Sequence, residues 1–198
     1  MFYMNYLKKP INIVISLAVL VLGVLAIVFC FTNELFGCEV IRDSYKDPYI
    51  TNLKYFDIKT SATSTFTFQG IIEFSTRLIE NQNNTDFVNY FEITSSMVNG
   101  ALALKILVIV LISCYGIFAL SQLFDFRAYT SLGVSLVSFI ILLVIKTVAL
   151  KTFTEPYFIN YTTDMLSTIT WLWIIAFILS SIQVSYNLVL KYVKKAEK

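Results

Sequence analysis

The sequence predicts an all-α membrane protein: a four-transmembrane-helix bundle with a small α+β extracytoplasmic domain between spans one and two. Three observations carry this prediction. The 198 residues are 57% hydrophobic and only 14% charged, with a mean hydropathy of +0.73, whereas soluble domains carry about 25% charged residues. Four apolar runs approach or exceed the roughly 20 residues that cross a bilayer. A long segment of mixed composition separates the first run from the second.

The four predicted spans differ in the few polar and aromatic residues that they carry. They cover residues 11–31, 101–124, 130–150 and 165–190. Asn12 is the only strongly polar residue of the first, and Trp171 and Trp173 near the start of the fourth are placed like an interfacial aromatic belt. We expect the first run to be a retained span, because it is 21 residues long, against roughly 7–15 for a signal-peptide core.

Basic residues outside the spans predict the orientation, because cytoplasmic loops carry an excess of Lys and Arg. The N-terminal segment 1–10 and the tail 191–198 are rich in lysine, and the turn 125–129 carries Arg127; four spans place all three on one side. The segment 32–100 holds five basic and nine acidic residues. We therefore expect both termini in the cytoplasm, the segments 32–100 and 151–164 outside, and residence in the cell membrane.

The segment 32–100 is predicted to contain strands followed by helices. The stretches YITNLKYFDIKT and TSTFTFQG are typical of strands, and in the second one Phe66 and Phe68 alternate with threonines. From Gly70 the apolar spacing becomes helical, and Asp86 can cap a second helix that leads into the second span. The aromatic residues expected to form the core of this domain are Tyr45, Tyr49, Tyr55, Phe56, Phe66 and Phe68.

Several classes of function lack the residues that they need. The chain has no histidine, the commonest general base and metal ligand. Its three cysteines cannot build a CxxC zinc site, and its net charge of +2 gives no case for nucleic-acid binding. HExxH, GxSxG and P-loop motifs are absent from the sequence. We expect no enzyme activity, no cofactor, no metal and no catalytic residue.

Two sets of polar residues inside the spans are candidate sites. Ser180, Gln183 and Asn187 recur at helical spacing on one face of the fourth span. The third span contributes small polar residues at interface spacing, namely Ser131, Ser135 and Ser138. Buried amides and hydroxyls commonly bond to a neighbouring helix. The alternatives are contacts within the bundle, a polar pathway for a substrate, and a helix contact with another protein.

Three lysines are predicted near the outer ends of the second and third spans: Lys105, Lys146 and Lys151. They could form a basic ring that attracts anions or an acidic partner. The alternative is that their ammonium groups reach the lipid headgroups while their stems stay in the membrane.

The stretch CFTNELFGCEV, at 30–40, places Cys30 at the outer edge of the first span and Cys38 in the first turn of the outer domain. Two thiols with structural roles are the leading interpretation. A disulfide needs Cα atoms within about 7 Å, so the chain would have to turn back between them, and lipid attachment at Cys38 is a third alternative. Asn83 and Asn160 begin glycosylation sequons on the predicted outer side.

In topology the chain resembles the claudin and peripheral-myelin-protein group of four-span proteins. The letters LFGC at 35–38 are similar to the end of the claudin signature, with Phe36 in place of tryptophan and no second outer cysteine after Cys38. The resemblance implies four spans, cytoplasmic termini and a first outer segment of strands and a helix. It carries no functional residue to this chain.

The leading hypothesis is a non-enzymatic membrane protein that acts through contacts with another membrane or extracytoplasmic protein, or with a second copy, in adhesion, assembly or as an accessory subunit. Its basis is a structured outer domain combined with spans whose centres lack Asp and Glu. The alternatives are a small transporter or channel component, and an immunity-type membrane protein of a bacterium. Besides the protein partner, the predicted surroundings are the lipid bilayer.

Overall fold

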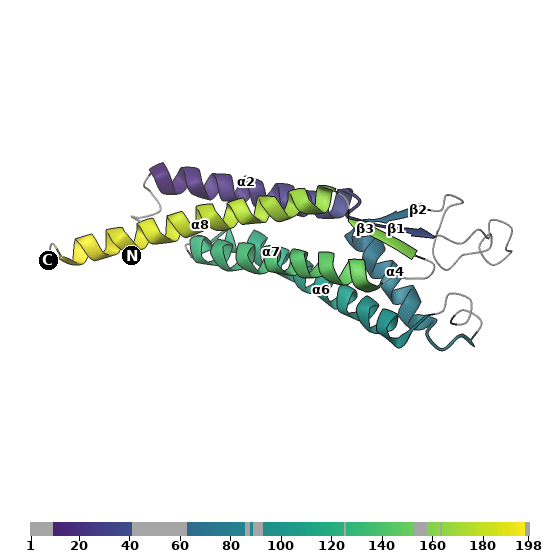
Figure 1. Ribbon diagram of the computed structural model, residues 1–198. Helices are drawn as coiled ribbons and strands as arrows, with labels where there is room; N and C mark the ends of the chain where they lie inside the picture. Colours follow the sequence, from purple (N-terminus) through teal and green to yellow (C-terminus); the bar gives the residue numbers. More distant parts are fainter. Residues whose placement is uncertain are drawn as a thin grey trace. The chain divides into compact units, whose positions relative to one another are not determined.

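The computed structural model describes residues 10–40, 63–85, 88, 93–124, 126–152, 158–162 and 164–196. Four of its helices are long and apolar enough to cross a membrane, which confirms the predicted multi-pass, four-span membrane protein. These are α2 (Pro10–Thr32), α6 (Ser95–Ser121), α7 (Arg127–Thr152) and α8 (Asp164–Ala196) (Figure 1). The other described elements are helix α4 (Phe68–Glu80) and the strands β1 (Phe36–Val40), β2 (Thr63–Phe66) and β3 (Phe158–Thr162).

Each of the four helices begins before the apolar run that predicts it, whereas α6 ends at Ser121, three residues before the predicted end of the second span. α6 begins six residues before the predicted start of the second span, and α8 continues into the basic tail. With 33 residues, α8 is about 50 Å long at 1.5 Å per residue, against a hydrocarbon core of about 30 Å. Its acidic first residue, Asp164, suits the positive end of the helix dipole. Hydropathy therefore locates the spans but does not give the bounds of the helices.

The chain divides into two compact units. Unit 1 consists of Met1–Phe29, Leu111–Ile141 and Thr168–Lys198, and unit 2 consists of Cys30–Val110 and Leu142–Ser167. Unit 1 holds most of α2 and α8, and unit 2 holds the three strands and α4.

The buried positions of unit 1 recur at alternating spacings of three and four residues. On α8 they include Ile169, Trp173, Ala176, Ser180 and Gln183. On the part of α2 in this unit they are Asn12, Val19, Gly23 and Ala26, with half-buried Ser16 between the first two. This is the seam of helices that pack nearly antiparallel or parallel, with a crossing angle of about 20°.

An aromatic cluster fills the middle of unit 1. The rings of Tyr115 and Trp173 stack with centroids 5.3 Å apart, and Phe118 meets Trp173 edge to face at 5.5 Å. The indole Nε1 of Trp173 donates to the Tyr115 hydroxyl over 3.2 Å. The prediction that both tryptophans lie in an interfacial belt is wrong for Trp173, which is fully buried, whereas Trp171 is 62% exposed. Two residues apart on a helix, they point to different faces.

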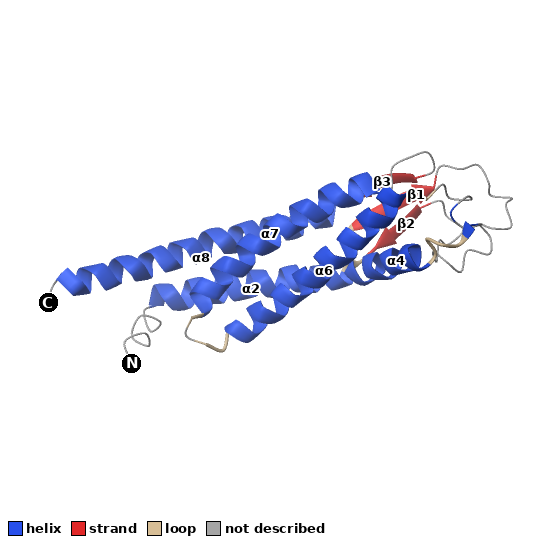
Figure 2. Ribbon diagram, turned by 90° about the horizontal axis from the view of Figure 1, so that it is seen from below, coloured by secondary structure: helices blue, strands red, loops and turns tan. Residues whose placement is uncertain are grey.

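Unit 2 contains an antiparallel sheet with the strand order β2-β1-β3. The central strand β1 begins four residues after α2 ends, and β3 ends two residues before α8 begins. Phe36 is opposite Phe66 of β2 and Thr162 of β3, and Cys38 is opposite Ser64 and Asn160. Figure 2 shows the three strands together in red, beside α4. The sequence does not predict β1 or β3: Cys38 lies in a strand and not in a turn, and the segment 151–164 contributes a strand.

Helix α4 follows β2 almost at once. Thr67 is its N-cap, and the Thr67 side chain accepts a hydrogen bond from the Gly70 backbone N–H. The predicted strand over 63–70 is therefore too long, because Phe68 already belongs to the helix. Phe68 is fully buried and meets Phe31 edge to face at 6.2 Å. Tyr45, Tyr49, Tyr55 and Phe56, together with the strand predicted over 49–60 and the cap Asp86, lie outside the described residues.

Candidate functional site

The polar face of α8 bonds to the first turns of α2. The Gln183 side-chain Nε2 donates to the Ser16 hydroxyl (2.7 Å) and to the Asn12 backbone carbonyl (3.2 Å). One turn further along α8, Asn187 Oδ1 accepts from Asn12 Nδ2 over 2.8 Å. Gln183 and Asn187 are four residues apart on α8, and their partners Ser16 and Asn12 are four residues apart on α2. The order of the partners is reversed, as expected for antiparallel helices. We call Asn12, Ser16, Gln183 and Asn187 the amide clamp.

The amide clamp is largely closed to solvent. Asn12 and Gln183 are buried, and Ser16 and Asn187 are half-buried. A carboxamide in an apolar setting costs free energy unless its donors are satisfied. Gln183 uses its amide nitrogen on two acceptors of α2, one of them a backbone carbonyl that no side-chain substitution on α2 would remove. The arrangement therefore fixes the register of α2 against α8.

The predicted serines of α7 are buried, and two of them have identified partners. Ser135 donates to the Ser131 carbonyl over 2.6 Å, and the Ser131 hydroxyl accepts from Nε2 of Gln122, the first residue after α6, over 3.2 Å. Gln122 also donates to the Phe118 carbonyl. The third serine of α7, Ser138, is fully buried, as is Ser180 on α8. Neither hydroxyl has a hydrogen-bond partner among the described residues.

The predicted basic ring is only partly described. Lys105 of α6 and Lys146 of α7 are both half-buried and both belong to unit 2. Lys151 lies in the last turn of α7, but its side chain is outside the described part. A common basic site for the three lysines stays a prediction.

The two cysteines of the stretch 30–40 belong to different elements. Cys30 is buried in the last turns of α2, and Cys38 lies in β1. The disulfide between them, the lipid attachment and the thiol interpretation all stay predictions. Of the two sequon residues, Asn83 is exposed in the turn after α4, and Asn160 lies within β3 opposite Cys38.

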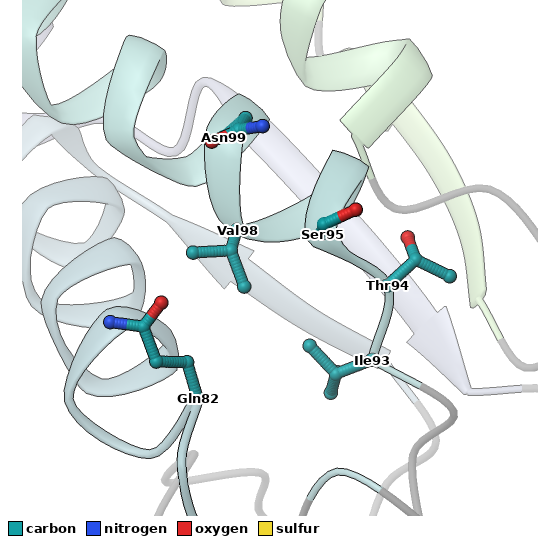
Figure 3. A pocket seen from close by; sticks show the side chains of 6 residues that line it. All are labelled: Gln82, Ile93, Thr94, Ser95, Val98 and Asn99. Atoms are coloured by element: carbon teal, nitrogen blue, oxygen red, sulfur yellow. The ribbon is translucent and has the colours of Figure 1, made fainter.

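A cavity of about 250 Å³ lies in unit 2 at the start of α6. It is lined by Gln82, Ile93, Thr94, Ser95, Val98 and Asn99. Figure 3 shows Gln82 on the segment that follows α4, across from the other five residues, which lie on the approach to α6 and its first turns. Thr94 is the N-cap of α6, since its hydroxyl accepts from the Met97 backbone N–H over 3.3 Å. The lining carries no formal charge, which suits neutral polar groups.

The described residues were compared with the ligand sets that hold metal ions in proteins. Among the described residues, no group of three or more His, Cys, Asp or Glu side chains could hold a metal ion.

Sequence reasoning found half of the amide clamp and missed its partners. Helical spacing selects Gln183 and Asn187 as candidates and does not select Ser16. The signal that could have found the partners is the equal spacing: Asn12 and Ser16 are four apart in an otherwise apolar run, as are Gln183 and Asn187. The cavity at the start of α6 had no signal, because its residues come from two separate segments.

No family model, no curated protein and no solved structure matches this chain. The resemblance in topology to the claudin group therefore stays a prediction.

Proposed function

We propose that this chain is a non-enzymatic membrane protein that acts through contacts made by an extracytoplasmic α+β domain with another protein or a second copy. The observation that carries the proposal is the pairing of β1 with β3. It joins the segment after the first span to the segment before the fourth span in one sheet. Two segments that are far apart in the sequence, 36–40 and 158–162, thus contribute to one surface.

The same pairing supports the proposed topology. β1 follows α2 closely and β3 directly precedes α8, so the end of the first span and the start of the fourth are on the same side of the membrane. Two spans between them, α6 and α7, satisfy this requirement. The basic segments at the opposite ends of these helices favour the cytoplasm for both termini. The sheet and α4 would then be extracytoplasmic.

The amide clamp weakens the alternative of a transporter or channel. A polar pathway through the bundle would use the face of α8 that carries Gln183 and Asn187. Those two side chains bond to α2 instead. Polar side chains that bond across helices contribute to packing, and the clamp is a packing feature of this kind. The transport alternative predicts flux in liposomes that Gln183→Leu abolishes.

The proposal is tested by isolating the full chain from its native membrane in mild detergent and measuring the mass of the complex. We expect a stoichiometric partner or a homo-oligomer. Glu39→Pro should abolish the association, because proline in the central strand β1 removes a ladder donor. Glu39→Thr, which keeps the N–H and suits a strand, should preserve it. A monodisperse monomer of the unaltered chain, or equal association of both variants, would contradict the proposal.

A further inference from the structure

Two buried hydroxyl groups in unit 1 differ from the other serines of its spans. Ser138 of α7 and Ser180 of α8 are both 0% exposed, and neither Oγ atom has a hydrogen-bond partner within the described ranges. A hydroxyl removed from water without a partner costs free energy, and in the membrane interior no lipid group replaces the lost bond. Such a pair calls for an acceptor or donor that the described residues do not supply.

Local sequence does not explain the lack of a partner. A serine in a helix can donate to the carbonyl three or four residues earlier, and neighbouring serines do so. Ser135 bonds to the Ser131 carbonyl over 2.6 Å, and Ser181 bonds to the Phe177 carbonyl over 2.8 Å. The hydroxyls of Ser138 and Ser180 make no such bond to the carbonyls of Val134 and Ala176. Their hydroxyls are thus free to meet a group between the helices.

The two serines lie at nearly the same level of the bundle. The rings of Phe139 on α7 and Phe177 on α8 are 6.1 Å apart, which aligns these two antiparallel helices. Ser138 is one residue before Phe139, and Ser180 is three residues after Phe177, so both are displaced toward the same end. At 1.5 Å per residue their levels differ by about 3 Å. Both positions belong to the buried seams of their helices.

We propose that Ser138 and Ser180 bind an ordered water molecule between α7 and α8. A water can donate to one hydroxyl and accept from the other, and buried waters typically make about three hydrogen bonds to groups that would otherwise lack partners. The carbonyls of Val134 and Ala176 accept backbone N–H groups within their helices and keep a second lone pair, which makes them candidate further acceptors. The serines at this level would then form a small-ligand site, distinct from the amide clamp, in which the amide nitrogens of Asn12 and Gln183 donate to other groups of the chain.

A double-mutant cycle tests this site in the full chain, reconstituted in lipid nanodiscs. If the water is bound, Ser138→Ala and Ser180→Ala each lower the Tm. The double variant then has a Tm no lower than that of the less stable single variant. The reason is that the first substitution already releases the water. If the hydroxyls bind nothing, either substitution removes an unpaired polar group. An unchanged or raised Tm in the single variants would therefore overturn the proposal. Ser181→Ala, which loses only a bond within its own helix, is the matched control.

A second measurement uses the unaltered protein. Brief X-ray radiolysis produces hydroxyl radicals from bound water, and these oxidise the nearest side chains. We expect oxidation of Phe139 and Phe177, and its loss in the Ser138→Ala/Ser180→Ala variant, while exposed Tyr192 at the end of α8 is oxidised equally in both. Equal oxidation of Phe139 and Phe177 in the two proteins, or none in either, would also overturn the proposal.

Discussion

Unit 1 and unit 2 are assembled by different kinds of contact. In unit 1, long helices meet along seams whose spacing repeats within each helix, so that every seam can be read from a single stretch of sequence. In unit 2, three short strands come from 36–40, 63–66 and 158–162, and the outer two pair with the same central strand. Periodicity within a segment therefore identifies the buried face of each helix in unit 1. The strand pairs of unit 2 join separate segments, so periodicity within one segment does not identify them.

The largest expected effect concerns the aromatic cluster, and it sharpens this comparison. Trp173→Ala removes a fully buried ring that contacts Tyr115 and Phe118. Replacing a buried aromatic residue by alanine costs about 3–5 kcal/mol, so we expect the free energy of unfolding to fall by this amount in reversible SDS titration. Trp171→Ala, at a position that is 62% exposed, should change it little. Equal losses at both positions would mean that the seam is placed on the wrong face of α8.

The next effect concerns a close approach of two helices at Gly23. A Cβ atom at Gly23 would lie 2.4 Å from Cζ of Phe118, and this ring is held by Trp173. Gly23→Ala should therefore destabilise the protein by about 1–3 kcal/mol, the usual cost of overpacking. At Gly116 and Gly133 nothing lies within 4 Å of an added Cβ, so alanine there should stabilise by up to about 1 kcal/mol. A neutral Gly23→Ala variant would contradict the close contact.

A smaller effect tests whether α4 of unit 2 depends on its own local signals. Thr67→Ala removes the N-cap that accepts from Gly70, at a cost of about 1 kcal/mol. Amide hydrogen exchange should become faster in α4 and stay unchanged in α2. Thr76→Ala, in the same helix, removes a hydroxyl that donates to the Ile72 carbonyl one turn earlier, and exchange should not become faster. Faster exchange in α2 as well would show that the units are less separate than described.

The smallest effect concerns the amide clamp. A double-mutant cycle of Ser16→Ala with Gln183→Leu should give a coupling energy of about 0.6 kcal/mol, with an upper limit near 1.7 kcal/mol, as for other hydrogen bonds between membrane helices. The measurement is the free energy of unfolding in SDS. Pairing Ser16→Ala with Ile182→Ala, at an exposed position of α8, should give no coupling. Additive losses at Ser16 and Gln183 would indicate that the two side chains do not interact.

The sequence predicts the four spans because each apolar run carries its own evidence of membrane burial. It also predicts the strand character of 63–66 and the helical spacing of Ile71 and Leu78, which are local properties. It does not reveal β1 or β3. The strand FGCEV contains glycine and glutamate, which are poor strand formers, and its structure comes from pairing on both sides.

The candidate site shows the same limit. Helical spacing places Ser180, Gln183 and Asn187 on one face, and all three lie on the buried or half-buried side of α8. Spacing cannot say which neighbour fills that face, because the partners Asn12 and Ser16 are more than 160 residues away. Trp173 was misplaced for a related reason: composition favours tryptophan at the interface, but the rotation of the helix puts this ring in the core.

The central claim is that the polar face of α8 is occupied by a neighbouring helix and does not line a water-filled path. Single-cysteine variants of a chain in which Cys30, Cys38 and Cys114 are replaced by serine test it directly. In native membranes, a small hydrophilic thiol reagent should label Lys191→Cys, at an exposed position, and leave Ser180→Cys and Gln183→Cys unlabelled. Labelling at 180 and 183 as fast as at 191 would contradict the account and favour a polar pathway.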